Sequence, residues 1–337
     1  MVELLGPADH GRARALVEEE GLQFDLAFDD LVGVHDRGEL VAVGARLGEV
    51  LKMVAVAHAH QGGALLGEIV TELVRLGSAA GLDAFFVFTK PESVRSFEAL
   101  NFALLASHGR AALLEYGNGL GRWLSANRPF VRDGVNGAVV VNCNPFTRGH
   151  RHLVEEAAQR VEMLYVFVVR EDRSVFPFDV RLRLVREGTN DLGNVHVLDT
   201  SRYAVSALTF PAYFLKQDDP VAAIQMELDL RLFAGHVAPA FHVRRRFFGT
   251  EPTCVTTRAY NDAMRRVLPA LGVAAVEIER VSTNGEAISA SRVRDALREG
   301  KLAGLEALVP PSTLSFLLSH DARAIRDRLL RGEGRHA

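Results

Sequence analysis

The sequence has few cysteines, no long apolar run and no strong excess of one charge. Its two cysteines, Cys143 and Cys254, disfavour a disulfide scaffold or a cysteine-built metal site. No apolar run approaches the length of a membrane span, and the first residues, MVELLGPADHGRAR, lack the apolar core of a signal peptide. A formal net charge of -3 disfavours a general polyanion binder. We therefore expect a cytoplasmic protein that binds neither membrane nor nucleic acid.

The chain is long and apolar enough for two domains. It has 337 residues, of which 48% are hydrophobic, and it shows no internal repeat or low-complexity segment. Glycine and asparagine recur between 117 and 137, which predicts a linker. This linker divides a first domain, 1–116, from a second domain, 138–320. The arginine-rich segment 321–337 is predicted to be a solvated helix with a frayed end.

The stretch 138–161, AVVVNCNPFTRGHRHLVEEAAQRV, predicts a buried strand, a sharp turn and a helix. Its first four residues are an apolar run typical of a parallel strand buried on both faces, and apolar residues from Leu153 recur at helical spacing. Acidic residues are usual in the first turn of a helix, but here the turn is basic: Arg148, His150, Arg151 and His152. Together with exposed backbone N–H groups and Gly149, these residues predict a bound anion such as phosphate.

Strand and helix alternate through the rest of the second domain. The predicted strands lie at 163–169, 195–198, 245–248 and 276–281, and the predicted helices near 180–188, 221–235, 257–268 and 291–299. This alternation is typical of an α/β fold with a doubly wound parallel sheet, in which ligands bind beyond the carboxyl ends of the strands. The turn at 142–149, the loop after Val169 and the segment before Ser291 can all reach that edge.

Two short motifs carry a resemblance. Residues 147–150, TRGH, and 288–294, ISASRVR, resemble the (H/T)xGH and ISxSxxR signatures of the nucleotidyltransferase and class I aminoacyl-tRNA-synthetase superfamily, in the expected order. The resemblance implies a Rossmann-like sheet (nucleotidyltransferase/HUP-like) and catalytic roles at the ATP phosphates for His150, Thr147 and Arg294. The further ATP- or phosphate-binding residues that it implies are Asn142, Asn144, Pro145, Phe146, Gly149, Gly249, Glu251, Ile288, Ser289 and Ser291.

A longer resemblance covers 137–318. The segments VVNCNPFTRGHRHLVEEAA, LYVFVVREDRSVFPFDVRLRLV, TFPAYFLK, RRRFFGTEPTCVTTRAYN and GEAISASRVRDAL are similar, in that order, to citrate lyase ligases. The family resemblance implies a ligase that acetylates the thiol of the citrate lyase acyl carrier subunit, whose prosthetic group derives from dephospho-CoA. ATP first converts acetate into acetyl-adenylate and pyrophosphate, and the carrier thiol then takes the acetyl group and releases AMP. Mg²⁺ is expected at the phosphates, although no carboxylate is identified as its ligand.

The first domain resembles an N-acetyltransferase-like (GNAT-like) α+β fold. Strands at 34–43, 51–57 and 84–88 and helices at 64–76 and 93–100 form a mixed pattern, with QGGALL at 61–66 and FTKPESVRSFEALNF at 88–102. The pyrophosphate loop of that fold usually has small residues where Ala64 and Leu66 stand, and a bulky side chain there obstructs a pyrophosphate. This departure disfavours acetyl transfer by the first domain. We hypothesise that the domain steers the prosthetic arm of the carrier to the adenylate.

Several residues near the site have competing interpretations. Lys216 either reaches a phosphate or the acetate carboxylate, or has no role there. Ser174 is a possible substrate contact in the charged loop 170–177, which either closes over the substrate or is only solvated. From their charge alone, we hypothesise that the arginines at 244–246 contact an acidic carrier protein. Ser289 and Ser291 either bind phosphate or only cap a helix.

Other residues are predicted to lie outside the site. His152 is predicted to face away from it, and Arg181 and Arg183 are predicted to be outward-facing helix charges. Cys143 and Cys254 are predicted to be small buried hydrophobic residues and not nucleophiles, because no base partner is evident for either.

Two rival functions remain. A nucleotidyltransferase that joins AMP to a phosphorylated cofactor precursor shares both signatures, but it keeps AMP in its product. A non-catalytic carrier-binding or regulatory protein is disfavoured because the phosphate-binding groups of both signatures are present, including His150 and Arg294. Pyrophosphate exchange into ATP with and without acetate distinguishes these functions.

Overall fold

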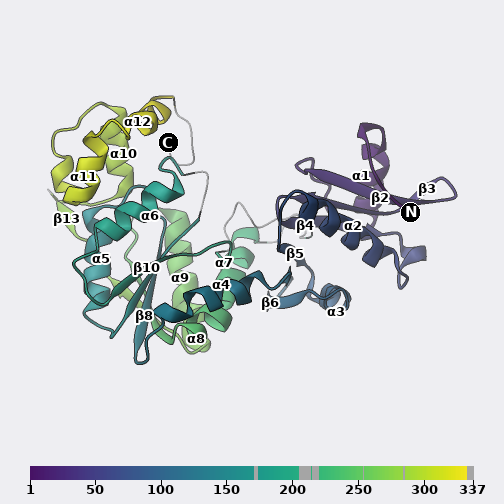
Figure 1. The fold of residues 1–337 in the computed structure, drawn as a ribbon, viewed down its shortest axis with the longest axis horizontal. Coiled ribbons are helices and arrows are strands. Elements are labelled where there is room, and N and C mark those ends of the chain that lie inside the picture. Colours follow the sequence, from purple (N-terminus) through teal and green to yellow (C-terminus); the bar gives the residue numbers. More distant parts are fainter. Residues whose placement is uncertain (171–173, 205–213, 215–219, 253, 284, 332–337) are drawn as a thin grey trace. The chain divides into compact units, whose positions relative to one another are not determined.

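The computed structural model describes residues 1–170, 174–204, 214, 220–252, 254–283 and 285–331. The chain forms two compact units, each with its own hydrophobic core (Figure 1). The first unit contains Met1–Ala126 and also, from much later in the chain, helix α7 (Val221–Leu232). The second unit begins at Asn127 and takes up the chain again from His236.

The second unit is built on a five-stranded sheet in which every neighbouring pair is parallel. The strand order is β10-β9-β8-β11-β12. The strands are β8 (Asn136–Val141), β9 (Leu164–Val168), β10 (Val195–Asp199), β11 (Val243–Gly249) and β12 (Ala274–Ile278). All five residues of β9, LYVFV, are buried, as expected for a parallel strand covered on both faces. The predicted α/β fold class is therefore confirmed.

The helices of the second unit alternate with its strands. They are α5 (Arg148–Ala158), α6 (Phe178–Glu187), α9 (Val255–Ala270), α10 (Ala290–Arg298), α11 (Pro311–Leu318) and α12 (Arg323–Leu330), with a short α8 (Ala238–Ala240) and a small hairpin of β13 (Ser282–Thr283) and β14 (Glu286–Ala287). Helix α12 is not simply solvated, as the sequence predicted for 321–337. Its Ile325 and Leu329 belong to the hydrophobic core, and α12 packs against α10.

The direction of the chain across the sheet reverses next to β8. From β8 the chain proceeds outward to β9 and β10, whereas β11 and β12 continue on the other side of β8. The connections that leave β8 and β11 therefore diverge, and a crevice opens between the carboxyl ends of these two strands. Such a switch point is where open parallel sheets bind their ligands.

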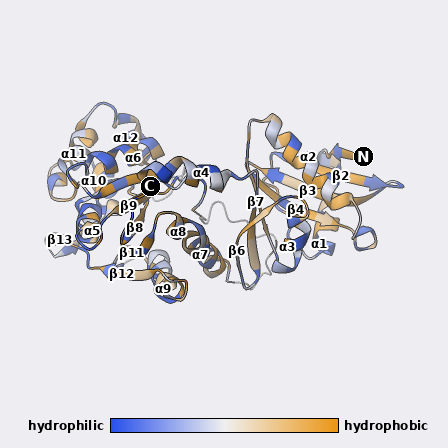
Figure 2. Cartoon of the chain, turned by 60° about the horizontal axis from the view of Figure 1, so that its bottom comes forward, coloured by the Kyte–Doolittle hydropathy of each residue, from blue (hydrophilic) through white to orange (hydrophobic). Residues whose placement is uncertain are grey.

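The first unit is a mixed sheet of seven strands, in the order β1-β2-β3-β4-β5-β7-β6. Only β4 and β5 pair in parallel, and all other neighbours are antiparallel. Figure 2 shows hydrophobic stretches along β2 and β4; α2 packs against β2, β3 and β4, and α1 packs against β3 and β4. The elements are β1 (Val2–Leu4), α1 (His10–Glu19), β2 (Asp30–Asp36), β3 (Glu39–Leu47), β4 (Val50–Val56), α2 (Leu65–Ala79), β5 (Phe85–Thr89), α3 (Val94–Glu98), β6 (Ala103–His108) and β7 (Ala111–Tyr116).

The predicted strand 34–43 is wrong, because this stretch is a hairpin. Strands β2 and β3 pair through Asp36 and Glu39, and the two residues between them, Arg37 and Gly38, both have positive φ (50° and 89°). Two consecutive residues of positive φ form the tight turn whose twist matches an antiparallel hairpin. The pattern of apolar residues continues on both sides of the turn, and this hid the reversal.

Two predicted boundaries also differ from the structure. The segment 117–137, predicted as a linker, contains a nine-residue helix, α4 (Gly119–Asn127). The buried carboxylate of Glu115 accepts the Leu120 N–H at the start of this helix and so compensates for a missing intrahelical partner. Helix α7 was assigned to the second domain, but it packs against β6 and β7 of the first unit.

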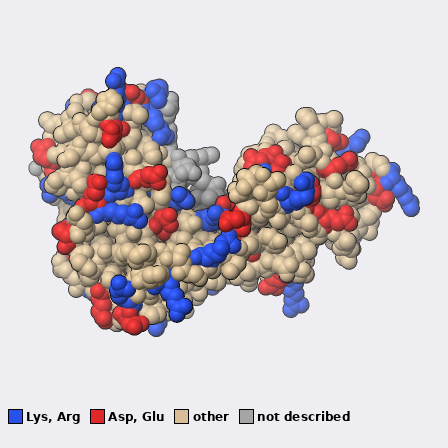
Figure 3. Space-filling model, in the orientation of Figure 1, with Lys and Arg blue, Asp and Glu red and all other residues tan. Residues whose placement is uncertain are grey.

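No helix among the described residues is both long and apolar enough to cross a bilayer. On the face of the molecule shown in Figure 3, basic and acidic side chains are interspersed.

Candidate functional site

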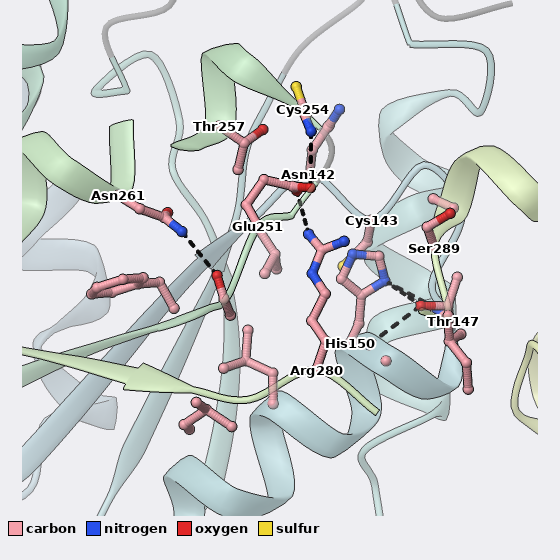
Figure 4. A pocket seen from close by; sticks show the side chains of 18 of the residues that line it. Asn142, Cys143, Thr147, His150, Glu251, Cys254, Thr257, Asn261, Arg280 and Ser289 are labelled. Carbon is pink, nitrogen blue, oxygen red and sulfur yellow. Dashed lines mark hydrogen bonds and ion pairs between the residues drawn. The ribbon is translucent and has the colours of Figure 1, made fainter. Parts of the chain in front are cut away.

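A pocket of ≈ 420 Å³ lies at the carboxyl ends of β8, β11 and β12 in the second unit (Figure 4). Its walls are the turn after β8 with the start of α5, the segment after β11 with the start of α9, the residues after β12, and the segment that leads into α10. The pocket therefore occupies the switch point of the sheet. Both sequence motifs contribute to it.

Eleven of the predicted site residues line this pocket. They are Asn142, Asn144, Thr147, Gly149, His150, Gly249, Glu251, Ile288, Ser289, Ser291 and Arg294. Pro145, Phe146 and Ser174 do not line it. Phe146 is fully buried in the core, where its ring packs nearly parallel to that of His150 with 5.9 Å between the ring centroids. Lys216 lies outside the described residues.

Thr147 and His150 hold each other at the start of α5. Thr147 is the N-cap residue, and its Oγ1 accepts the backbone N–H of His150 at 3.3 Å. In return, the backbone N–H of Thr147 donates to Nδ1 of His150 at 3.1 Å, and the Thr147 hydroxyl lies 2.9 Å from the same nitrogen. Because Nδ1 accepts, the proton of the neutral imidazole sits on Nε2. His150 therefore offers an N–H donor to the pocket.

The electrostatic environment keeps His150 neutral. Burial, and then the positive charge of Arg280, lower the pKa of His150 to about 4. A neutral imidazole costs less to desolvate than an imidazolium and can still donate one hydrogen bond. The side chain is thus suited to donate a hydrogen bond from Nε2 to an anionic oxygen. At neutral pH it lacks the second proton of an imidazolium, which it would need to act as a general acid.

Arg294 joins the second motif to the first. Its guanidinium donates to the backbone carbonyl of Asn144 at 2.6 Å and to the hydroxyl of Ser291 at 3.0 Å, and only 6% of the residue is exposed. Burial lowers the pKa of Arg294, but an arginine remains charged at neutral pH. Ser289 is the N-cap of α10 and accepts the Arg292 N–H at 3.3 Å. Ser289 therefore caps α10 and also lines the pocket, and the Arg294 cation lies behind the turn that follows β8.

Sequence reasoning missed an ion pair in the pocket wall. Arg280 donates to the carboxylate of Glu251, whose side chain is only 5% exposed (Figure 4). The predicted strand 276–281 included Arg280, whereas β12 ends at Ile278 and leaves Arg280 beyond the carboxyl edge. The alternation of apolar residues ends at Ile278, and this could have indicated that Arg280 lies beyond the strand. The pocket also contains Asn261, whose amide donates to the Gly249 carbonyl at 2.9 Å.

The basic first turn of α5 divides between two roles. Arg151 is ion-paired with Glu155 and Asp191, and Arg148 donates to the Glu306 carbonyl at 2.9 Å. Neither arginine lines the pocket, so neither contributes a direct contact to an anion bound there. His152 was predicted to face away from the site, but it lines the pocket together with His150. A helix that lies against the pocket exposes more than one face of its first turns to it.

Arg181 is fully buried and not an outward-facing charge as predicted. Its guanidinium donates to the carbonyls of Phe176, Asn142 and Val169, with distances of 2.8 to 3.0 Å. It also donates to the side-chain oxygen of Asn142, which is close to the hydroxyl of Ser174. Arg181 thereby ties the ends of β8 and β9 together, and Ser174 belongs to this buried support. Arg183 is exposed, as predicted.

The two cysteines differ in environment. Cys143 is buried, as predicted, and burial raises the pKa of its thiol. Cys254 was also predicted to be buried, but it is exposed, lines the pocket and precedes α9 as its N-cap residue. Hydrogen bonds from the side chain and the backbone of Thr257 lower the pKa of the Cys254 thiol. A residue at the start of a helix lies at the surface more readily than the flanking apolar residues suggested.

The three arginines at 244–246 do not form one surface. Arg244 is exposed, whereas Arg245 donates to the Arg160 carbonyl at 2.6 Å. Arg246 is only 3% exposed, lines the pocket and donates to the hydroxyl of Tyr260 at 3.0 Å. Because Arg246 is buried and Arg245 is engaged with a backbone carbonyl, a contact of all three with an acidic carrier is not supported.

Comparison with known proteins decides the family. Residues 136–317 match the family model of the citrate lyase ligase C-terminal domain. The chain belongs to the citrate lyase ligase family. A citrate pro-3S-lyase ligase of Klebsiella pneumoniae is 41% identical over 83% of this chain and 84% of its own length. One of Escherichia coli (strain K12) is 36% identical over 89% of this chain and 88% of its own length.

The family is therefore one of ligases, and the rival function of a simple nucleotidyltransferase is not favoured. Among solved structures, a putative GNAT-family acetyltransferase from Desulfovibrio desulfuricans is 16% identical and covers 35% of this chain and 98% of its own, with a TM-score of 0.30. A putative acyl-CoA N-acyltransferase from Klebsiella pneumoniae is 16% identical and covers 34% of this chain and 94% of its own, with a TM-score of 0.28. These likenesses say nothing about a substrate.

Proposed function

We propose that this ligase uses ATP to acetylate the thiol of the acyl carrier subunit of citrate lyase, and so activates that enzyme. One observation carries the proposal: in a chain of this family, both nucleotide-binding motifs converge on one pocket at the switch point of a parallel sheet. In the first step a carboxylate oxygen of acetate attacks the α-phosphorus of ATP, and the bond to pyrophosphate breaks. In the second step the carrier thiolate attacks the acetyl carbon, and the bond to AMP breaks.

The residues of the pocket are suited to the charge that moves in the first step. We assign to His150 a hydrogen bond from Nε2–H to a phosphate oxygen, which strengthens as negative charge develops on the departing pyrophosphate. Thr147 fixes the imidazole for this contact. Arg294 supports the site with positive charge and by holding the turn at Asn144. Such preorganised donors need no rearrangement during the reaction.

Mg²⁺ is expected to accompany ATP, because it would neutralise the negative charge of the phosphates. Within the described part of the chain, no cluster of three or more His, Cys, Asp or Glu side chains is arranged to hold a metal ion. In the pocket, Glu251 is already paired with Arg280, and Glu279 is exposed. These residues do not fit a dedicated magnesium cage, and we assign none of them as a ligand.

The test is acetate-dependent exchange of labelled pyrophosphate into ATP. The wild-type protein should catalyse exchange only when acetate is present, and His150→Ala should reduce the rate about 10²- to 10³-fold, the loss typical of removing one transition-state donor. Exchange without acetate would indicate a different acceptor. Unchanged exchange in His150→Ala would remove His150 from the site.

We further propose that the first unit receives the prosthetic arm of the carrier. Strands β4 and β5 pair at only two positions, Val50 with Phe86 and Leu51 with Val87. The pocket of ≈ 330 Å³ lies beyond these pairs, where the two strands separate. The walls combine apolar residues with polar ones, including Leu66, Lys90 and Ser93. This mixture suits an extended arm that contains amide groups and phosphate.

Filling this pocket tests the arm proposal better than deleting the first unit, because deletion would uncover α7. Ser93→Trp should raise the KM for the carrier about tenfold and leave acetate-dependent exchange unchanged, since exchange takes place in the other unit. Ser78→Trp is the matched control, because Ser78 is exposed on α2 and does not line the pocket. Loss of both reactions, or carrier acetylation equal to wild type, would reject the proposal.

A further inference from the structure

We propose that Arg280 is the cation in direct contact with the triphosphate of ATP, and that Glu251 orients it for this contact. The inference rests on the proposed function and deepens it. Arg280 belongs to neither of the two sequence motifs. It therefore adds a residue to the reaction that the resemblance to nucleotidyltransferases did not supply.

Two anchors fix the position of Arg280 at the edge of the sheet. The residue follows the carboxyl end of β12, and its backbone N–H donates to the hydroxyl of Thr250 at 3.1 Å. Its guanidinium is paired with Glu251 and lines the pocket, and 26% of the side chain is exposed. The side chain is thus held in place and still accessible to a ligand in the pocket.

Glu251 is built to hold this arginine. One oxygen of its carboxylate pairs with Arg280, and the other accepts the backbone N–H of Cys254 at 3.0 Å. A carboxylate that is 95% removed from water needs such partners, because an isolated buried charge is costly. Both oxygens are therefore engaged, and Glu251 acts on a ligand through Arg280. We assign it as a positioning residue.

Arg294 occupies a different position relative to the pocket. Its guanidinium donates to Asn144 and Ser291, and the residue is only 6% exposed. It contributes positive charge from within the wall and stabilises the turn. Arg280 is more accessible, and a guanidinium can donate two parallel hydrogen bonds to a phosphate while one edge stays on a carboxylate.

The location of Arg280 relative to His150 indicates where the anion would bind. The charge of Arg280 acts on His150, and both side chains line the pocket, as Figure 4 shows. A cation beside a neutral imidazole whose Nε2 carries the proton gives donors that converge on one region. A phosphate oxygen there would accept from both and would lie in the positive potential of Arg294 as well.

The experiment compares Arg280→Gln, Arg280→Lys and Glu251→Gln with the wild type. The readouts are the KM for ATP in acetate-dependent exchange and the Kd of a non-hydrolysable ATP analogue. We expect Arg280→Gln to raise both constants about 10- to 100-fold, the loss typical of a charge-assisted contact. Arg280→Lys should recover part of the loss, because it keeps the charge but not the paired donors. Glu251→Gln should change both constants in the same direction by a smaller factor.

Arg265→Gln is the matched control. Arg265 is an exposed arginine of the same unit and forms an ion pair with Glu277 outside the pocket, so the variant makes the same change of charge. A pH profile separates an electrostatic role of Arg280 in the pocket from a merely structural one. Without the Arg280 charge the pKa of His150 rises, so the acid limb of kcat/KM should move to higher pH. A residue with only a structural role would not shift this limb.

The outcomes distinguish the inference from the proposed function. If the wild type shows no acetate-dependent exchange, the proposed function fails, and binding of the analogue still tests Arg280. If the wild type exchanges normally and Arg280→Gln keeps its KM and Kd, the inference is overturned. An equal effect of Arg265→Gln would overturn it too, since the effect would then come from net charge. If Arg280→Gln does not fold, Arg280→Lys and Glu251→Gln decide the question by the same readouts.

Discussion

Gly149 and Ile288 approach each other so closely that no side chain fits between them. A Cβ atom at Gly149 would lie 2.9 Å from the carbonyl oxygen of Ile288, which is shorter than real Cβ contacts. Gly149 belongs to the first turn of α5, and Ile288 opens the motif before α10. The missing Cβ is therefore what lets two distant motifs share one pocket.

Gly149→Ala should weaken both activity and stability. The added methyl group must push the Ile288 segment away, and overpacking of this kind costs about 1–3 kcal/mol of the free energy of unfolding. Displacing Ser289 and Ser291 from the pocket should lower the rate of pyrophosphate exchange by about tenfold or more. Urea unfolding and exchange assays measure the two effects. Gly193→Ala is the control, because a Cβ there meets nothing within 4 Å, and equal behaviour of the two variants would refute the packing argument.

Stability should fall in acid because of His150. Its pKa is about 4 in the folded protein and about 6.5 when unfolded, so the unfolded chain binds the extra proton between these values. The stabilising contribution is complete above pH 6.5 and is lost as the pH falls towards 4. The difference between the two pKa values corresponds to at most about 3 kcal/mol of the free energy of unfolding. We expect a smaller loss, about 2 kcal/mol, because the side chain is partly exposed to solvent.

Urea unfolding between pH 7 and pH 4 measures this loss. His150→Gln keeps a side chain of similar polarity but cannot titrate, so its unfolding free energy should depend less on pH in this window. The same slope in the variant and the wild type would show that other groups cause the acid sensitivity.

Cys254 should react with iodoacetamide in the folded protein, and Cys143 should not. Cys254 is exposed and Thr257 lowers the pKa of its thiol, whereas Cys143 is buried and the pKa of its thiol is raised. Mass spectrometry after brief alkylation should find the label on Cys254, with a labelled fraction at least about tenfold higher than that of Cys143. ATP should slow the labelling, since Cys254 lines the same pocket as His150. Comparable labelling of both cysteines would contradict this account.

Arg181→Met should destabilise the second unit by about 2–4 kcal/mol, because several backbone carbonyls lose a buried charged donor. Arg183→Met, two residues away on the same helix, removes an exposed charge and should change the unfolding free energy by less than about 1 kcal/mol. Chemical denaturation of both variants provides the measurement. If Arg183→Met were the more damaging change, the support assigned to Arg181 would be wrong.

The motif residues could be predicted because their chemistry is local. A threonine, a glycine and a histidine in one turn make a cap and a donor wherever a strand feeds a helix, and α5 shows this geometry at Thr147. Arg280 could not be predicted in the same way. Its importance comes from Glu251, which lies far from it in the sequence and beside it only after β11 and β12 have paired.

Burial decided several other residues against the sequence patterns. Arg181 and Cys254 were assigned opposite exposures to those observed, because a position is buried or exposed only relative to what packs on it. The place of α7 shows the same limit. Its own pattern marks a helix, but the strands against which it packs, β6 and β7, come from the first 126 residues of the chain and form one unit with it.

The sequence by itself determined the alternation of strand and helix, the two motifs and the family to which they belong. These features depend on spacing along the chain, and spacing is visible before folding. Only the tertiary structure decided which charges meet in the pocket, which of them are already engaged, and which thiol is exposed. Those properties depend on distances between residues that are remote in sequence, and packing of the sheet and its helices sets these distances.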